Sequence, residues 1–379
     1  MRILILGGDG YLGWPTALHL SDAGHEVGIV DDLSRRRIDR ELGTESLVPI
    51  QGINARHDAW YDVSGHELRW FNAAVDTGGE LVYELQEFQP DAVIHLAEQR
   101  SAPYSMLDSW HAAYTQRRNV IGTLNLIHAV AEVNPDIHIV KLGSLGEYGT
   151  PNLDIEEGWL NVEHNGRRDR VLYPKRPGSW YHLSKVHDSN NLEFACRTWG
   201  LRVTDLNQGI VYGTHTEQTL RDPALETRYD YDEFFGTALN RFAVQAALGE
   251  PLTVYGDGTQ VRGFIDLRDS VRCLELACLH PAGRGEFRVF NQLTETFSIL
   301  EIAQHVAAVT GATVRHLPNP RVEEQSHRYR VTRTGLKELG LEPHLLNALV
   351  INVLVERAKR HLSRVNPDVI QPTVSWHRQ

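Results

Sequence analysis

The chain has 379 residues, a net charge of −11 at neutral pH and a hydrophobic content of 41%. This length and composition are typical of a globular protein with one large domain or two modest ones. The acidic balance argues against a nucleic-acid binder, whose affinity depends on neutralising phosphates. The three cysteines include no Cys-x-x-Cys pair, so we expect neither a disulfide framework nor a metal site.

The first apolar run, residues 3–6, is followed directly by glycines. It is too short for a signal sequence and favours a buried strand. No stretch approaches the roughly 20 apolar residues that a membrane span needs. These features predict a cytoplasmic protein that has no membrane partner.

Short apolar or β-branched runs alternate with segments of helical spacing along the first half of the chain. The runs at residues 3–6, 27–30, 92–95, 137–142 and 203–206 predict strands. Because helical segments separate them, they predict a doubly wound α/β fold with a parallel sheet of the Rossmann type. Such sheets bind ligands at the carboxyl ends of their strands.

A glycine-rich turn follows the first predicted strand and opens a helix expected over residues 14–23. A turn in this position places a dinucleotide pyrophosphate at the helix N-terminus. The turn residues expected to bind the cofactor are Gly7, Gly10, Tyr11, Leu12 and Gly13.

The second predicted strand ends at Asp31 and Asp32. A carboxylate at this spacing accepts hydrogen bonds from an adenosine ribose, which favours NAD over NADP. Arg35 and Arg36 follow closely and leave open the alternative that they bind a 2′-phosphate.

Two polar segments interrupt the alternating pattern. Residues 152–178 contain several glycines and prolines and predict an insertion over the active site. After a second break at 214–231, shorter apolar stretches at 252–255, 263–267 and 287–291 indicate a smaller α/β lobe. We therefore predict an NAD-binding domain over residues 1–213 and a mainly substrate-binding lobe over 214–379, from which segments can return to the first domain.

Three side chains suggest the chemistry. Tyr181 and Lys185 stand four residues apart, which places both on one face of a helix. A phenol titrates at about 10 in water, and a neighbouring ammonium and a positive nicotinamide lower that pKa, so Tyr181 can remove a hydroxyl proton. Lys185 is also expected to hold the nicotinamide ribose. Ser144, after the strand at 137–142, can donate to the same hydroxyl oxygen.

Three stretches match a known pattern: Asn-Val-Ile-Gly-Thr at 119–123, Asn-Gln-Gly-Ile-Val-Tyr-Gly at 207–213 and Arg-Gly-Phe-Ile-Asp at 262–266. On these the chain resembles the extended short-chain dehydrogenases that act on UDP-sugars, including 4-epimerases and 4,6-dehydratases. On residues 98–105, 146–152, 181–188 and 235–242 it is most similar to the UDP-sulfoquinovose synthases.

This resemblance implies that UDP-glucose is the substrate, that sulfite or a sulfite-delivering protein is the second partner, and that NAD stays bound between turnovers. It assigns Asn119 to the cofactor. It also implies that Ser144 and His182 contact the substrate. Further residues that it assigns to the substrate and its anions are Arg100, Gln208, Thr237, Asn240, Arg262 and Arg321.

The segment after Ser144 departs from the related dehydratases. Those enzymes place Asp-Glu directly after the catalytic Thr, whereas here Leu145 and Gly146 follow Ser144. Because that acid/base pair is absent, Glu147 and His182 are our candidates for proton transfer at C5 and C6 or for holding sulfite. The alternatives are a structural carboxylate at Glu147 and a packed helix residue at His182.

Other functions stay open at this point. A UDP-sugar 4-epimerase, or another NAD-dependent nucleotide-sugar dehydratase, would use the same Ser144, Tyr181 and Lys185. A noncatalytic NAD-sensing protein on the same fold is an alternative of another class. Segments 109–132 and 181–199 have the length of the helices through which many relatives dimerise, so a homodimer is expected.

Overall fold

The computed structural model describes residues 1–322 and 329–376. Its centre is a seven-stranded parallel sheet in the order β12-β8-β5-β4-β1-β2-β3. The strands are β1 (Arg2–Leu6), β2 (Glu26–Val30), β3 (Leu68–Phe71), β4 (Ala92–His95), β5 (His138–Ser144), β8 (Arg202–Gln208) and β12 (Phe287–Gln292). The predicted doubly wound fold is confirmed, and all five predicted strands lie in this sheet.

Successive side chains of a strand point to opposite faces of the sheet. Both faces are apolar here, and helices cover both of them. Ile3 and Ile5 of β1 pack in one apolar cluster with α1 and α10, whereas Leu4 and Leu6 pack in another with α4, α7 and α8. The bounds of these helices are α1 (Gly13–Asp22), α4 (Glu80–Phe88), α7 (Gly122–Val133), α8 (Trp180–Trp199) and α10 (Leu267–Leu279).

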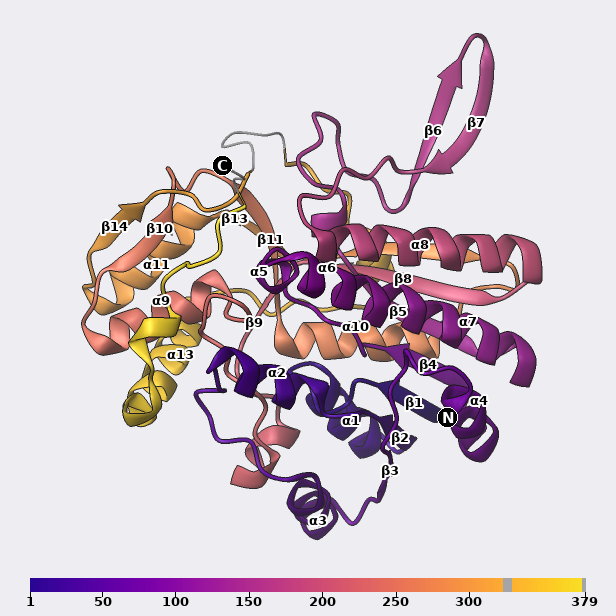
Figure 1. Cartoon of the computed structure of the whole chain (residues 1–379), viewed down its shortest axis with the longest axis horizontal. Coiled ribbons are helices and arrows are strands. Elements are labelled where there is room, and N and C mark those ends of the chain that lie inside the picture. Colours follow the sequence, from indigo (N-terminus) through magenta and orange to yellow (C-terminus); the bar gives the residue numbers. More distant parts are fainter. Residues whose placement is uncertain (323–328, 377–379) are drawn as a thin grey trace.

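A smaller lobe lies beside the carboxyl ends of the central strands (Figure 1). It contains the sheet β13-β11-β9, the strand pair β10-β14 and three helices that enclose an apolar cluster. Its elements are β9 (Ile210–Tyr212), β10 (Leu252–Tyr255), β11 (Val261–Asp266), β13 (Glu295–Ser298), β14 (Val314–Leu317), α9 (Ala238–Leu248), α11 (Ile299–Thr310) and α13 (Ala348–Arg360).

The apolar stretch at 287–291 belongs to the large sheet and not to the smaller lobe in which we expected it. As β12 it pairs with β8 along its whole length, from Phe287 opposite Val203 to Gln292 opposite Gln208. The short helix α12 (Gly335–Glu338) packs against it. An apolar run identifies a buried strand, but it carries no information about which sheet the strand joins.

The insertion at 152–178 forms the hairpin of β6 (Trp159–His164) and β7 (Arg167–Leu172), which projects from the body of the molecule (Figure 1). At its base, Ile155 and Tyr173 pack with Leu145 and Tyr148. Among the described residues, none from 152–178 lines the cavity described below. The insertion therefore supports the loop behind Ser144, and its position over the active site stays a prediction.

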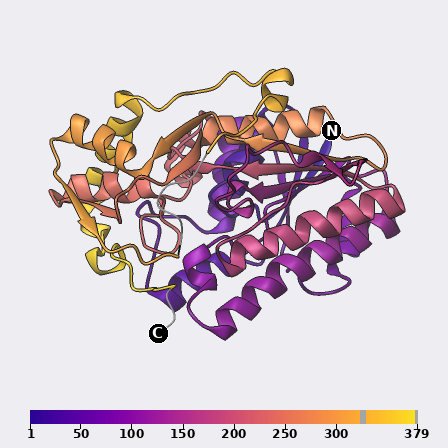
Figure 2. The same ribbon diagram turned by 90° about the horizontal axis from the view of Figure 1, so that it is seen from above.

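Two long helical segments lie side by side at the surface (Figure 2). One is α8, and the other runs from α6 (Ser109–Gln116) through a π-helical turn, Arg117–Ile121, into α7. Among the described residues, the remaining α-helices are α2 (Ser34–Leu42), α3 (Ile53–Ser64) and α5 (Ala102–Ser105). Within residues 1–322 and 329–376, no helix has the length and apolar character to span a bilayer.

Candidate active site

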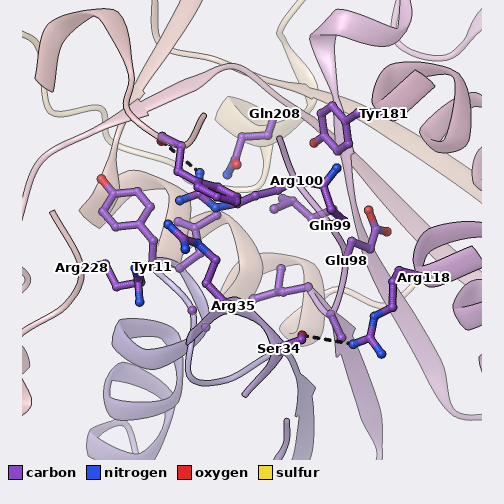
Figure 3. A pocket seen from close by; sticks show the side chains of 18 of the residues that line it. Tyr11, Ser34, Arg35, Glu98, Gln99, Arg100, Arg118, Tyr181, Gln208 and Arg228 are labelled. Carbon is purple, nitrogen blue, oxygen red and sulfur yellow. Dashed lines mark hydrogen bonds between the residues drawn. The ribbon is translucent and has the colours of Figure 1, made fainter. Parts of the chain in front are cut away.

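A cavity opens where β1, β2, β4, β5 and β8 end, which is the edge at which parallel sheets bind ligands (Figure 3). Most residues that we predicted from the sequence line it together. They are Gly7, Gly10, Tyr11, Leu12, Gly13, Asp31, Asp32, Arg35, Arg100, Ser144, Tyr181, Lys185, Gln208, Thr237 and Asn240.

The turn after β1 requires its glycines. Gly7 has a φ of +88°, in the left-handed region, and a Cβ on Gly13 would lie 2.1 Å from the Gly7 carbonyl oxygen. A Cβ on Gly8 would lie 2.4 Å from the side chain of Ile29. Since α1 begins at Gly13, its first backbone amides border the cavity and fit a pyrophosphate.

Asp31 stands at the end of β2 with its carboxylate in the cavity wall. Its oxygens accept hydrogen bonds from the backbone amides of Asp9 (2.9 Å) and Leu33 (2.7 Å). Burial, with the nearby charge of Asp9, raises the pKa of Asp31 to about 6. Arg36 does not line the cavity, because it makes a bidentate pair with Asp9 at 2.6 and 2.7 Å. The arrangement favours a ribose over a 2′-phosphate at this end.

Three arginines of the cavity wall converge on Asp230. Arg100 contacts one carboxylate oxygen at 2.5 Å, and Arg35 and Arg228 each lie 3.3 Å from the other. Burial opposes the charge of Asp230, but the three guanidinium groups hold its pKa far below the usual value. Arg35 also lies 3.4 Å from the centre of the Phe235 ring. The predicted Arg35 and Arg100 thus reach the cavity, but they do so as members of an ion-pair cluster.

The three predicted catalytic residues meet at the end of β5. Tyr181 and Lys185 lie on α8, and the Lys185 Nζ is 5.9 Å from the centre of the Tyr181 ring and donates to the Leu142 carbonyl at 2.5 Å. Burial raises the pKa of Tyr181, and the Lys185 ammonium opposes this rise. The Ser144 hydroxyl accepts a hydrogen bond from the Gly146 amide (3.1 Å) and lines the same cavity.

His182 lies beside Tyr181, with 4.8 Å between the ring centres. Its Nδ1 is 2.9 Å from the hydroxyl of Ser179, which also caps α8. The pKa of His182 is lowered to about 4, mainly because the ring is buried. The positive charges of Arg321 and Arg262 lower it further. The imidazole is therefore neutral at pH 7, and the predicted Arg262 and Arg321 lie close enough to affect it. None of these three residues is among those that line the cavity.

Glu147 does not reach the cavity. Its buried carboxylate contacts the Lys175 ammonium at 2.5 Å and accepts hydrogen bonds from the Ser144 amide (2.8 Å) and the Ser189 hydroxyl (3.1 Å). Burial opposes its charge, but Lys141 and Lys175 lower the pKa of Glu147 to about 2. Such a weak base behind the loop fits the structural alternative, and we no longer assign Glu147 to proton transfer at C5 and C6.

Asn119 also lies outside the cavity wall. Its buried side-chain amide accepts a hydrogen bond from the Gln99 backbone N–H (2.8 Å) and donates to the Gln99 carbonyl (3.0 Å). It also donates to the Ser184 hydroxyl (2.8 Å). It fixes the loop after β4 to α8, and its assignment to the cofactor stays a prediction. Among the substrate candidates, Gln208 donates to Ser270 (2.5 Å).

Several residues of the cavity wall were missing from the sequence-based set: Glu98, Gln99, Tyr114, Arg118, Arg228, Asp230 and Phe235. Glu98 and Gln99 belong to the stretch 98–105 that carried the resemblance, and this was the available signal for them. Arg228 and Asp230 lie in the polar break at 214–231, where nothing in the local pattern indicates a ligand site.

The model of the NAD dependent epimerase/dehydratase family matches residues 3–291, so the fold and the site define a member of this family. The UDP-sulfoquinovose synthase of Sulfolobus acidocaldarius is 42% identical over 386 residues, covering this whole chain and 98% of that protein. The chloroplastic UDP-sulfoquinovose synthase of Spinacia oleracea is 50% identical over 382 residues, covering the whole chain and 79% of that protein. Within the family, the chain belongs to the UDP-sulfoquinovose synthases, and it is an NAD-dependent enzyme.

Solved structures agree on the fold. The UDP-glucose 4-epimerase of Thermotoga maritima, determined with UDP-glucose, has a TM-score of 0.71 at 21% identity and covers 96% of this chain and 100% of its own. The UDP-glucose 4-epimerase of Thermus thermophilus, determined with NAD, has a TM-score of 0.66 at 23% identity, with coverages of 95% and 99%.

Proposed function

We propose that the protein converts UDP-glucose and sulfite into UDP-sulfoquinovose and water. One observation carries the proposal: Ser144, Tyr181 and Lys185 line the same cavity as the glycine turn and Asp31. A site for oxidising a sugar hydroxyl and a site that fits NAD are thus continuous. Sulfite reaches it either free or from a partner protein that delivers it.

The first step takes place at C4 of the glucose. Bound NAD supplies the hydride acceptor there and, at the end of the cycle, the hydride donor. Tyr181 removes the proton of the C4 hydroxyl, and Ser144 donates a hydrogen bond to the same oxygen. Lys185 favours the phenolate form of Tyr181 by its positive charge and also holds the nicotinamide ribose.

The next steps take place at C5 and C6, where the 4-ketone has made the C5 proton acidic. The neutral imidazole of His182 accepts this proton and passes it to the leaving C6 hydroxyl, which departs as water and leaves a 5,6-double bond. The sulfur of hydrogensulfite then adds at C6, His182 transfers the proton that hydrogensulfite loses to C5, and C4 takes back its hydride and the proton held by Tyr181. Arg262 and Arg321 supply positive charge for the sulfite and the diphosphate.

Mass spectrometry of the products tests the proposal, with purified protein, UDP-glucose, and sulfite present or absent. A sulfonated UDP-hexose that forms only with sulfite, and that is lost in Tyr181→Phe, is the expected result. Conversion to UDP-galactose without a sulfonated product would leave the 4-epimerase. Absence of any turnover would contradict the proposed substrates and favour another nucleotide-sugar reaction or NAD sensing.

We also propose that two copies associate through α6, α7 and α8. The outer face of these helices exposes large aromatic side chains: 58% of Trp110, 48% of Phe194 and 40% of Trp199 are accessible. Trp199 of α8 contacts His128 of α7 at 5.1 Å between ring centres, so the apolar surface continues across the two helices. Light scattering should give the mass of a dimer, and Phe194→Glu should reduce it to that of a monomer.

A further inference from the structure

Glu98 places a second buried charge directly against Lys185. It follows β4 in the loop toward α5, and its side chain is 2% exposed while that of Lys185 is 4% exposed. The Lys185 ammonium contacts the Glu98 carboxylate on one side and donates to the Leu142 carbonyl on another. Figure 3 shows Glu98 and Tyr181 on the same side of the pocket.

The surroundings make Glu98 the anion that compensates Lys185. The titratable or charged groups around the pair are His95 on β4, Arg100 after it, Lys141 on β5, Glu147 after β5, Tyr181 and Asp188 on α8. Among the residues that the structure describes, Glu98 is the one acid within ion-pair distance of Lys185.

The other groups are either neutral or already paired. Burial lowers the pKa of His95 to about 3, so this ring carries no charge at neutral pH. Burial and the charge of Glu98 raise the pKa of Asp188 well above its usual value, which favours its protonated form. Lys141 lies 3.5 Å from both Glu147 and Asp205.

We infer that Glu98 is a positioning residue for the reaction at C4. Its carboxylate holds the Lys185 ammonium near the Tyr181 ring and offsets much of the electrostatic effect of this ammonium on the phenol. The inference rests on the catalytic roles proposed above for Tyr181 and Lys185. An unpaired ammonium within about 4–6 Å lowers the pKa of an acidic group by about 1–3 units. With Glu98 in place, Lys185 has a smaller effect on Tyr181.

The proposed cycle gives a reason for this balance. Tyr181 takes the C4 proton at the start and must return it to the same oxygen when C4 is reduced. A strongly stabilised phenolate would help the first transfer and hinder the second. A lysine paired with a carboxylate leaves the phenol able to do both.

The test is a titration of the Tyr181 phenol in the full-length protein loaded with NAD. Ultraviolet difference spectra against the same variant carrying Tyr181→Phe isolate this phenol. Glu98→Gln should lower the midpoint by about one pH unit or more, because the ammonium is then uncompensated. Glu98→Ala should do the same, and Glu98→Asp, which keeps the charge, should stay close to the wild type. The acid limb of kcat/KM for UDP-glucose should move in the same direction.

Glu84→Gln is the matched control, since it removes a buried carboxylate from α4 that is not among the residues lining the cavity. It should leave the midpoint unchanged even if the melting temperature falls. Unchanged midpoints in both Glu98→Gln and Glu98→Ala would overturn the inference, as would an equal shift in Glu84→Gln. Absence of sulfonated product from the wild type would refute the proposed function, whereas the phenol titration would still decide the role of Glu98.

Discussion

Glu147→Gln separates a structural role of this residue from a chemical one. The substitution keeps the size of the side chain but removes its charge from Lys175 at 2.5 Å and Lys141 at 3.5 Å. Breaking a buried ion pair by removing one partner costs about 3–5 kcal/mol. The pKa leads to a similar value, because a fall from 4.5 to about 2 corresponds to about 3 kcal/mol. We expect the free energy of unfolding to fall by about 3 kcal/mol at neutral pH.

The pH dependence gives an independent check. Because folding lowers the pKa of Glu147, its stabilisation is complete above pH 4.5 and is lost as the pH falls toward about 2. The difference in stability between the wild type and Glu147→Gln should therefore shrink across this range. Denaturant unfolding of the NAD-loaded protein at several pH values measures it.

Glu163→Gln is a suitable control. It removes a surface ion pair of 2.8 Å with Arg168 from the hairpin, and the cost should stay below about 1 kcal/mol. If Glu147→Gln were as stable as the wild type and yet failed to form product, Glu147 would have a chemical role and our reasoning would be refuted.

Three further substitutions test the site. Gly13→Ala should abolish NAD binding, because the new Cβ would lie 2.1 Å from the Gly7 carbonyl oxygen. The NAD content of the purified protein measures this. Gly52→Ala is the control and should retain NAD, since no atom lies within 4 Å of a Cβ at that position. Asp31→Asn should weaken NAD binding about tenfold in calorimetry and improve that of NADP, and unaltered preference would disprove the ribose contact. His182→Asn should leave NAD reduction by UDP-glucose intact but slow product formation by at least about 100-fold, and full activity would exclude His182 as the proton carrier.

The parts of the fold that the sequence predicted are those whose signal is local. A strand buried on both faces reads as a short apolar run, and residues 3–6, 27–30 and 92–95 all became central strands. The glycine turn and the spacing of Tyr181 and Lys185 are also local patterns, each tied to one turn or one helix face. Each of these patterns therefore predicts the geometry of its own turn or helix face.

The parts that the sequence did not predict depend on contacts between distant residues. Nothing near residue 287 indicates that this strand pairs with residues 202–208. Glu147 was a candidate for proton transfer because the local sequence does not reveal its ion-pair partners. These are Lys175 of the insertion and Lys141 of β5. In the same way, the pairing of Arg35 with Asp230 joins residues that are 195 positions apart.

The loop after Ser144 connects the missing acid/base pair with the position of His182. Where the related dehydratases carry Asp-Glu, this chain has Leu145, which packs in an apolar cluster with Tyr148, and Gly146. A Cβ on Gly146 would lie 2.2 Å from Nε2 of His182, so any larger side chain there would displace the imidazole. The absence of a side chain at Gly146 therefore leaves the space that the His182 imidazole occupies beside Tyr181. In the cycle proposed above, an imidazole that is neutral at pH 7 would accept the C5 proton without placing a negative charge next to the incoming sulfite anion.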